Sequence, residues 1–196
     1  LSKLALQLDE ELLQSNQAGA AAAAARRLSS ITLLPLTSSS RCENFCRELA
    51  ASLAKFGNTL TLTATNLREH GAPAGLADGD AAISDQLQYW VHQQETLNRF
   101  LVYQCEPGDS QWSRFAMRQS DLVVFIADAR DNAAQSDWEA RLRAGKGTAT
   151  GRQALVLLQP SSDTPITGTA LWLDKRKPDF HLHVREDKAD DVQRVA

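Results

Sequence analysis

From Ser30 onward, short runs of apolar residues alternate with longer amphipathic segments. The short runs are rich in β-branched and aromatic residues, which favour strands, and the longer segments carry apolar residues at helical spacing. Alternation of this kind is typical of βαβ units, in which helices cover both faces of a parallel sheet. We therefore expect an α/β fold of three layers with a mostly parallel sheet of five or six strands. These are predicted at residues 31–36, 59–64, 100–104, 122–127 and 154–158, with a sixth at 180–184.

Four amphipathic segments between these runs predict helices. The first has Phe45, Leu49, Leu53 and Phe56 on its inner face and ends at Gly57 and Asn58, which are typical helix-stop residues. The others are predicted at residues 81–97 (Ile83, Leu87, Trp90, Val91 and Leu97 inside, Asp80 as N-cap), 110–118 (Trp112, Phe115 and Ala116 inside) and 133–143 (Ala134, Trp138 and Leu142 inside). All four tryptophans, Trp172 included, fall on predicted helix faces, which indicates packing on the sheet. Segments 70–80 and 145–151 are predicted loops. From the strands and helices together, we expect residues 29–196 to form one Rossmann-like domain.

Residues 1–28 precede this pattern and are predicted to be an N-terminal helix and a linker. Leu1, Leu4, Leu8 and Leu12 recur at helical spacing and predict a helix over residues 1–17 with a single apolar stripe. The alanine-rich segment 18–25 follows as a helical linker. The stripe needs a partner, and three remain open: the core of this domain, a second copy in a homodimer, or a preceding domain that this helix closes.

Charge and cysteine content exclude several classes of protein. The net charge is −3 and the basic residues are scattered, so we expect no nucleic-acid binding. No apolar run approaches the roughly 18 to 20 residues that a membrane span requires. Cys42 and Cys46 lie four apart on a predicted helix, which suits neither a disulfide framework nor a zinc site. With no signal-peptide pattern either, we expect a reducing, cytoplasmic location.

The motifs of two common classes of active site are absent from the sequence. No Gly-x-Ser-x-Gly string offers a hydrolase nucleophile, and no Gly-x-Gly-x-x-Gly follows the first strand, so neither ester hydrolysis nor dinucleotide binding is expected. The run from Gly145 to Thr148 lacks the first glycine of the Walker spacing and precedes a strand rather than following one, which indicates a loop. We therefore predict no catalytic residue and no cofactor in this chain.

One segment has the features of an anion site. Thr37, Ser38, Ser39, Ser40 and Arg41 follow the first strand and lead into a helix, where backbone amides and the helix dipole favour negative charge. The hydroxyl groups and the arginine can add donors for a phosphate or nucleotide. The alternative is that the serines simply cap the helix, and it is favoured by the absence of a glycine or lysine in this segment.

Two groups of polar residues are weak indications of a metal site. His181 and His183 have strand spacing and share a face, but no third ligand is evident. Four aspartates lie at the ends of one predicted strand or in the loop after it: Asp121, Asp128, Asp131 and Asp137. Aspartate is also common in loops and at helix starts, so we expect solvent-facing or hydrogen-bonded histidines, structural aspartates and no metal.

Two resemblances follow from the order of these segments. The first predicted unit, the Pro107-Gly108-Asp109 loop and Ser120-Asp121 before a strand resemble the layout of the deviant-Walker ParA and MinD ATPases, without their chemical residues. A second resemblance rests on the runs 31–36, 59–64 and 101–104, Tyr89-Trp90 with His92 to Glu95, Trp112, Arg118 to Asp121 running into 122–127, and His181 to Arg185 followed by 190–196. Together these resemble the central region of neuropathy target esterase and its bacterial relatives, between the cyclic-nucleotide-binding and patatin domains.

The second resemblance implies a function for the parent protein. Family members hydrolyse phospholipid or lysophospholipid esters with a Ser-Asp dyad at or near a membrane, and no residue of that dyad is carried onto this chain. The resemblance implies a non-catalytic connector or regulatory domain, with residues 1–28 ending a cyclic-nucleotide-binding domain and a patatin domain downstream. Its parent would act on lipids at the cytoplasmic face of a membrane. The alternative is a nucleotide- or phosphate-binding module related to degenerate ParA or MinD-like enzymes.

Overall fold

The computed structural model of the chain describes residues 28–73, 85–144, 151–161, 166–185 and 189–196. Six strands form one sheet in the order β2-β3-β1-β4-β5-β6, and every pair of neighbours is parallel. This confirms the expected parallel α/β sheet. The strands are β1 (Ser30–Pro35), β2 (Thr59–Leu62), β3 (Phe100–Gln104), β4 (Leu122–Asp128), β5 (Arg152–Gln159) and β6 (Phe180–Arg185).

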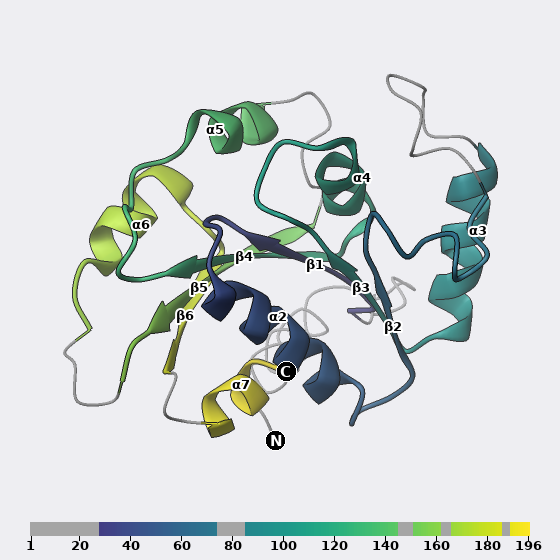
Figure 1. The fold of residues 1–196 in the computed structure, drawn as a ribbon, viewed down its shortest axis with the longest axis horizontal. Coiled ribbons are helices and arrows are strands. Elements are labelled where there is room, and N and C mark those ends of the chain that lie inside the picture. Colours follow the sequence, from purple (N-terminus) through teal and green to yellow (C-terminus); the bar gives the residue numbers. More distant parts are fainter. Residues whose placement is uncertain (1–27, 74–84, 145–150, 162–165, 186–188) are drawn as a thin grey trace, which may run out of the picture.

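Helices cover both faces of this sheet and complete the predicted three layers. Figure 1 shows α2 and α7 on one face, with α3, α4, α5 and α6 on the other. They are α2 (Ser40–Leu53), α3 (Asp85–Leu97), α4 (Gln111–Gln119), α5 (Asp137–Ala144), α6 (Thr169–Arg176) and α7 (Ala189–Val195). Of these, α6 and α7 have no counterpart among the predicted ranges.

Each face of the sheet has its own apolar core. Because side chains alternate along a strand, Ile31 and Leu33 of β1 join the core under α2, whereas Leu34 joins the core under α4. All six residues of β1 are buried, since the strand lies in the middle of the sheet. The four tryptophans lie on α3, α4, α5 and α6, as predicted, and contribute to the second core.

Three residues predicted to face inward are exposed instead. The first helix ends at Leu53, and its last turn tightens through bonds such as Phe56 N to Leu53 O, which rotate the Phe56 side chain to 59% exposure. Leu97 is 70% exposed. Helical spacing predicts which side of α3 faces inward, but it does not show whether the sheet extends under the last turn of the helix. Ala134 is exposed because α5 begins only at Asp137.

Other predictions lie partly outside the described residues. The helix over residues 1–17, the linker 18–25, the Asp80 N-cap, residues 81–84 of the predicted helix and most of segments 70–80 and 145–151 fall there. Within the described part of the chain, no helix has both the length and the apolar character needed to cross a bilayer.

Candidate functional site

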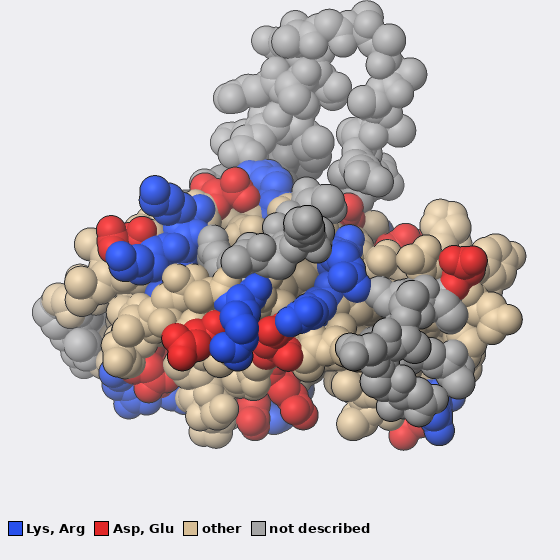
Figure 2. All heavy atoms as spheres, turned by 90° about the horizontal axis from the view of Figure 1, so that it is seen from above, with Lys and Arg blue, Asp and Glu red and all other residues tan. Residues whose placement is uncertain are grey.

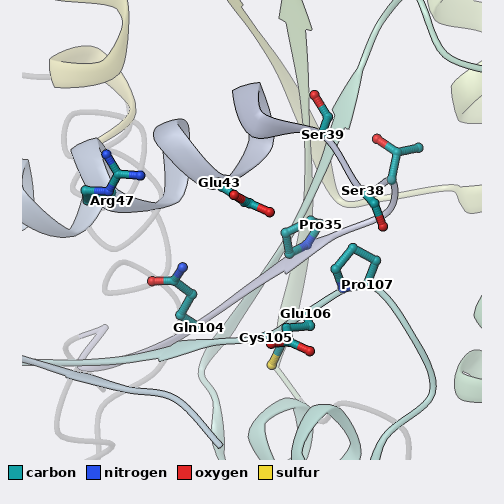
Figure 3. Close-up of a pocket in the computed structure, with 10 residues that line it drawn as sticks. Pro35, Ser38, Ser39, Glu43, Arg47, Gln104, Cys105, Glu106 and Pro107 are labelled. Atoms are coloured by element: carbon teal, nitrogen blue, oxygen red, sulfur yellow. The ribbon is translucent and has the colours of Figure 1, made fainter. Parts of the chain in front are cut away.

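A crevice opens at the carboxyl ends of β1 and β3. In this sheet β1 lies between β3 and β4, so the order of strands reverses there, which is where open parallel sheets usually bind ligands. The crevice holds a cavity of about 250 Å³ between the start of α2 and the segment after β3. Figure 3 shows Ser38 and Ser39 in the loop before α2, Glu43 and Arg47 along that helix, and Gln104 to Pro107 opposite them.

The structure divides the five predicted anion-site residues into two groups. Thr37, Ser38 and Ser39 line the cavity, but Ser40 and Arg41 are not among its lining residues. Ser39 is the N-cap of α2, and its hydroxyl accepts a hydrogen bond of 3.2 Å from the Arg41 backbone N–H. The capping interpretation is therefore confirmed for Ser39, and its oxygen is already in use.

The Arg41 side chain points away from the cavity to the end of β4. Its guanidinium donates to Asp128 at 2.5 Å and to the carbonyl of Gln159 at 2.8 Å. The side chain of Arg41 is 11% exposed and that of Asp128 is 4% exposed. Arg41 therefore binds groups within its own chain and joins α2 to β4 and β5.

Asp128 is the centre of this polar cluster. Arg130 donates to it from its backbone N–H at 3.0 Å and from two side-chain nitrogens at 3.2 and 2.9 Å. Burial by itself raises the pKa of Asp128, but the hydrogen bonds from Arg130 and Arg41 outweigh burial and lower it to about 2. The carboxylate is thus ionised at neutral pH and held by two arginines.

The charge that lines the cavity comes from residues that our sequence analysis did not select. Glu43 and Glu106 contribute two carboxylates and Arg47 one guanidinium, so the charged lining residues sum to −1. Glu43 lies in the first turn of α2. The position of Glu43 just after a strand-to-helix loop could have indicated a residue of the crevice. Acidic residues are also favoured in the first turn of any helix, so the position does not distinguish the two.

The backbone here does not have the form of a phosphate cradle. Only four residues, 36–39, join β1 to α2, and none of them is glycine or lysine. A Walker loop needs four residues between two glycines, followed by a lysine, so that successive amides surround the phosphates. The connection here is shorter and lacks those residues.

Asp121, like Asp128, and His183 have hydrogen-bond partners within the domain. Asp121 lies at the amino end of β4 and accepts hydrogen bonds from the backbone and hydroxyl groups of Ser29 and Ser30, at 3.0 to 3.2 Å. It is therefore at the opposite end of the strand from Asp128. His183 contacts Gln159 Nε2 at 3.0 Å, as expected of a hydrogen-bonded histidine. Among the described residues, no group of three or more His, Cys, Asp or Glu side chains is placed to hold a metal.

The cysteines in and below the crevice are poor nucleophiles. Cys42, Cys46 and Cys105 are buried and unpaired as thiols, and Cys105 lines the cavity. Burial raises the pKa of Cys105, and burial with its acidic neighbours raises that of Cys46 to about 12. Because only a thiolate attacks efficiently, these thiols are unsuited to covalent catalysis at neutral pH.

Sequence comparison places this chain among known proteins. A model of the "Neuropathy Target Esterase family P-loop like domain" matches residues 27–196. Patatin-like phospholipase domain-containing protein 7 of Mus musculus is 28% identical over 159 residues, which cover 80% of this chain and 11% of the relative. Neuropathy target esterase sws of Drosophila virilis is 30% identical over 151 residues, which cover 76% and 10%. The chain therefore spans about a tenth of the length of these curated relatives.

Structure comparison finds the same fold in plasmid partition proteins. A crystal structure of such a protein from Borrelia burgdorferi has a TM-score of 0.56 and 11% identity, covering 86% of this chain and 97% of that one. A putative plasmid partition protein from strain B31, bound to AMPPNP, has a TM-score of 0.54 and 12% identity, covering 87% and 97%. At such low identity the similarity is one of fold alone.

Proposed function

This chain belongs to the family of P-loop-like domains of neuropathy target esterases, and on that premise we propose that it is a non-catalytic connector within a longer patatin-type phospholipase. The proposed parent hydrolyses phospholipid or lysophospholipid esters at the cytoplasmic face of a membrane. Its catalytic patatin domain lies downstream of this segment, and a cyclic-nucleotide-binding domain lies upstream. The relatives' names, and the small share of each that this chain matches, 11% and 10%, support a longer phospholipase or esterase as the parent.

One observation carries the proposal: at the carboxyl edge of the sheet, beside the crevice, the charged groups are held by the chain's own side chains. Arg41 binds Asp128 and Gln159, and so links α2 to β4 and β5. The loop between β1 and α2 is too short for a phosphate-binding loop, and the nearby cysteine thiols are buried. Such a cluster stiffens the carboxyl edge of the sheet, which suits a domain whose role is to hold its neighbours in position.

The surface charge supports the expectation of no nucleic-acid partner. Figure 2 shows Lys and Arg side chains intermixed with Asp and Glu side chains on the face seen from above, rather than gathered in one basic region. Among the described residues, Arg114 pairs with Asp109 at 2.6 Å. Backbone phosphates favour clustered positive charge, which the face in this view lacks.

We expect the isolated chain to release no fatty acid from a lysophospholipid and no product from a short-chain ester above the rate of a mock-purified sample. Turnover at an ordinary enzyme rate, about 1 s⁻¹ or faster, that follows this chain through purification would contradict the proposal. In a longer polypeptide that includes the catalytic region, replacement of residues 29–196 by a flexible Gly-Ser linker is expected to alter ester hydrolysis. An unchanged rate would show that the domain is not needed as a connector.

A second candidate function is binding of a phosphate or nucleotide at Thr37 to Arg41. The cavity favours it, because three of the five residues line this cavity at the start of a helix. The carboxylates oppose it. At an effective dielectric constant of about 20, a negative charge about 6 Å from one carboxylate is repelled by about 3 kcal/mol. Arg47 in the same lining offsets about one of the two repulsions, and a helix terminus contributes only about 0.3 to 1 kcal/mol.

Titration calorimetry with ATP, GTP, cyclic nucleotides and orthophosphate separates these two functions. We expect no heat of binding at millimolar ligand. If phosphate does bind in the cavity, Glu43→Gln with Glu106→Gln should tighten binding by removing repulsion. The control is Glu48→Gln, which removes an exposed carboxylate from the same helix but not from the cavity lining. Tightening in the double variant and none in the control would establish the second function.

A further inference from the structure

The cavity at the carboxyl ends of β1 and β3 has a carboxylate on each of two walls. Glu43 lies on α2 and Glu106 follows β3, and Figure 3 shows the Glu43 side chain extending from the helix into the space between them. Both residues are exposed, and neither carboxylate has a hydrogen-bond or ion-pair partner among the described residues. Asp128 differs, because two arginines hold its carboxylate. The two glutamates are therefore available to a ligand.

The rest of the lining offers hydrogen-bond acceptors and apolar surface. Ser38 contributes a hydroxyl oxygen and Gln104 an amide oxygen, and in the described part of the chain neither side chain is hydrogen-bonded. Pro35, Cys105 and Pro107 add apolar surface. The volume of about 250 Å³ is below the roughly 300 to 1,000 Å³ of sites for drug-sized ligands, which indicates a small ligand.

The composition of the lining distinguishes among cations. A metal ion needs more ligands than two carboxylates supply, and the described residues hold no group of three or more His, Cys, Asp or Glu side chains placed for one. A quaternary ammonium is recognised by aromatic faces, and none of the lining residues is aromatic. A primary ammonium carries three N–H donors, which match the carboxylate, amide and hydroxyl oxygens present.

We propose that this cavity binds a small aliphatic primary amine with one positive charge. The ammonium group lies between Glu43 and Glu106, and the alkyl chain contacts the prolines. One positive charge balances the lining, whose charged residues sum to −1. Arg47, one turn further along α2, donates to Asn44 Oδ1 at 3.1 Å and leaves both glutamates to the ligand. The bound amine joins α2 to the segment after β3.

NMR titration of the whole ¹⁵N-labelled chain with 4-amino-1-butanol, in parallel with 1,4-butanediol, tests the proposal. The two compounds have the same carbon chain and differ by an ammonium group in place of one hydroxyl. We expect the amine to shift the amide signals of residues 37–39, 43 and 104–106 saturably at millimolar concentration, and the diol to shift none. Raising the salt from about 0.01 M to about 1 M should weaken amine binding several-fold, because salt screens the carboxylates.

Substitutions in the lining have effects of opposite sign. Glu43→Gln and Glu106→Gln should each weaken amine binding about two- to five-fold, the effect of losing one solvent-exposed ion pair. Arg47→Gln should tighten it by a similar factor, because the variant removes a cation that repels the ligand. Glu48→Gln is the matched control, since it causes the same change in net charge on the same helix but outside the lining.

The outcomes separate the possible ligands of the cavity. Equal shifts with the amine and the diol, or unchanged affinity in both glutamine variants, overturn the proposal. Tighter binding of choline or of Mg²⁺ than of the amine also overturns it and assigns the cavity to a quaternary ammonium or a metal ion. Weaker binding in both glutamine variants, with Glu48→Gln unchanged, supports it. The inference stands apart from the connector role, because ester hydrolysis bears on that role alone.

Discussion

Replacing Arg176 with methionine is expected to lower the free energy of unfolding by about 3 to 5 kcal/mol, the cost of leaving one member of a buried ion pair alone. Arg176 and Glu139 have side chains that are 2% and 1% exposed. Arg176 Nε lies 2.8 Å from one carboxylate oxygen and Nη2 donates to the other at 2.8 Å. Nη1 donates to Ala133 O at 2.8 Å, and the guanidinium lies 4.7 Å from the centre of the Trp172 ring.

Urea unfolding of the variant and two controls measures this effect. Lys175→Met changes the neighbouring exposed cation, whose pairing with Asp174 is at the surface, and should change stability by less than about 1 kcal/mol. The double variant Arg176→Met with Glu139→Leu should recover much of the loss, because it removes both buried charges. If Arg176→Met alone were as stable as the unaltered chain, the buried pair between α5 and α6 would not contribute to stability.

Asp128→Asn is expected to cost about 2 kcal/mol at pH 7, because the amide cannot neutralise the two arginines that hold the carboxylate. Folding lowers the pKa of Asp128 from 3.8 to about 2. A shift of about two units corresponds to about 2 to 3 kcal/mol. The side chain is 4% exposed, so solvent screening reduces this estimate little.

The pH dependence identifies the source of that stability. Because the folded pKa is below the unfolded value, the contribution is fully present above about pH 4 and is lost as pH falls through about 2. The stability difference between the unaltered chain and Asp128→Asn should therefore shrink over that interval. Asp131→Asn, an exposed neighbour in the same loop, is the control. A difference that stayed constant from pH 7 to pH 2 would show that ionisation of Asp128 is not involved.

Both predictions concern charges held within the domain rather than offered to a ligand. Arg41, the one cationic residue among the five predicted to bind an anion, is bound instead to Asp128 and the Gln159 carbonyl. Disrupting this cluster should loosen the connection of α2 to β4 and β5. In the proposed connector, such loosening is the route by which a substitution far from any catalytic serine would alter the parent enzyme.

The local pattern predicted much of the fold correctly. All six strands were expected within two residues of their observed positions, because each is a short run rich in apolar or β-branched residues between polar segments. The N-capping role of Ser39 was also predictable, since the hydroxyl acts on backbone two residues away. Helices α6 and α7 were given no range. Trp172, on α6, was expected on a helix face, but few apolar residues around it repeat at helical spacing.

The candidate site was predictable only in part. The sequence indicated Thr37, Ser38 and Ser39, and these line the cavity, but Glu43, Arg47 and Glu106 were not selected. Glu106 reaches the crevice only because β3 pairs with β1, a contact between segments about seventy residues apart in the chain. Arg41 was assigned to an anion because its actual partner, Asp128, is 87 positions away in the sequence, and local spacing does not show that the two meet.

The sequence by itself determined the class of fold, the family and the absence of a Gly-x-Ser-x-Gly or Walker motif, because these depend on residue order and on contacts over a few positions. Only the tertiary structure decided the charge of the crevice and the partner of each buried ion. Asp128 with Arg41 and Glu139 with Arg176 are separated by 87 and 37 positions. Such pairs depend on which strands are neighbours and which helices meet, and local spacing carries no record of either.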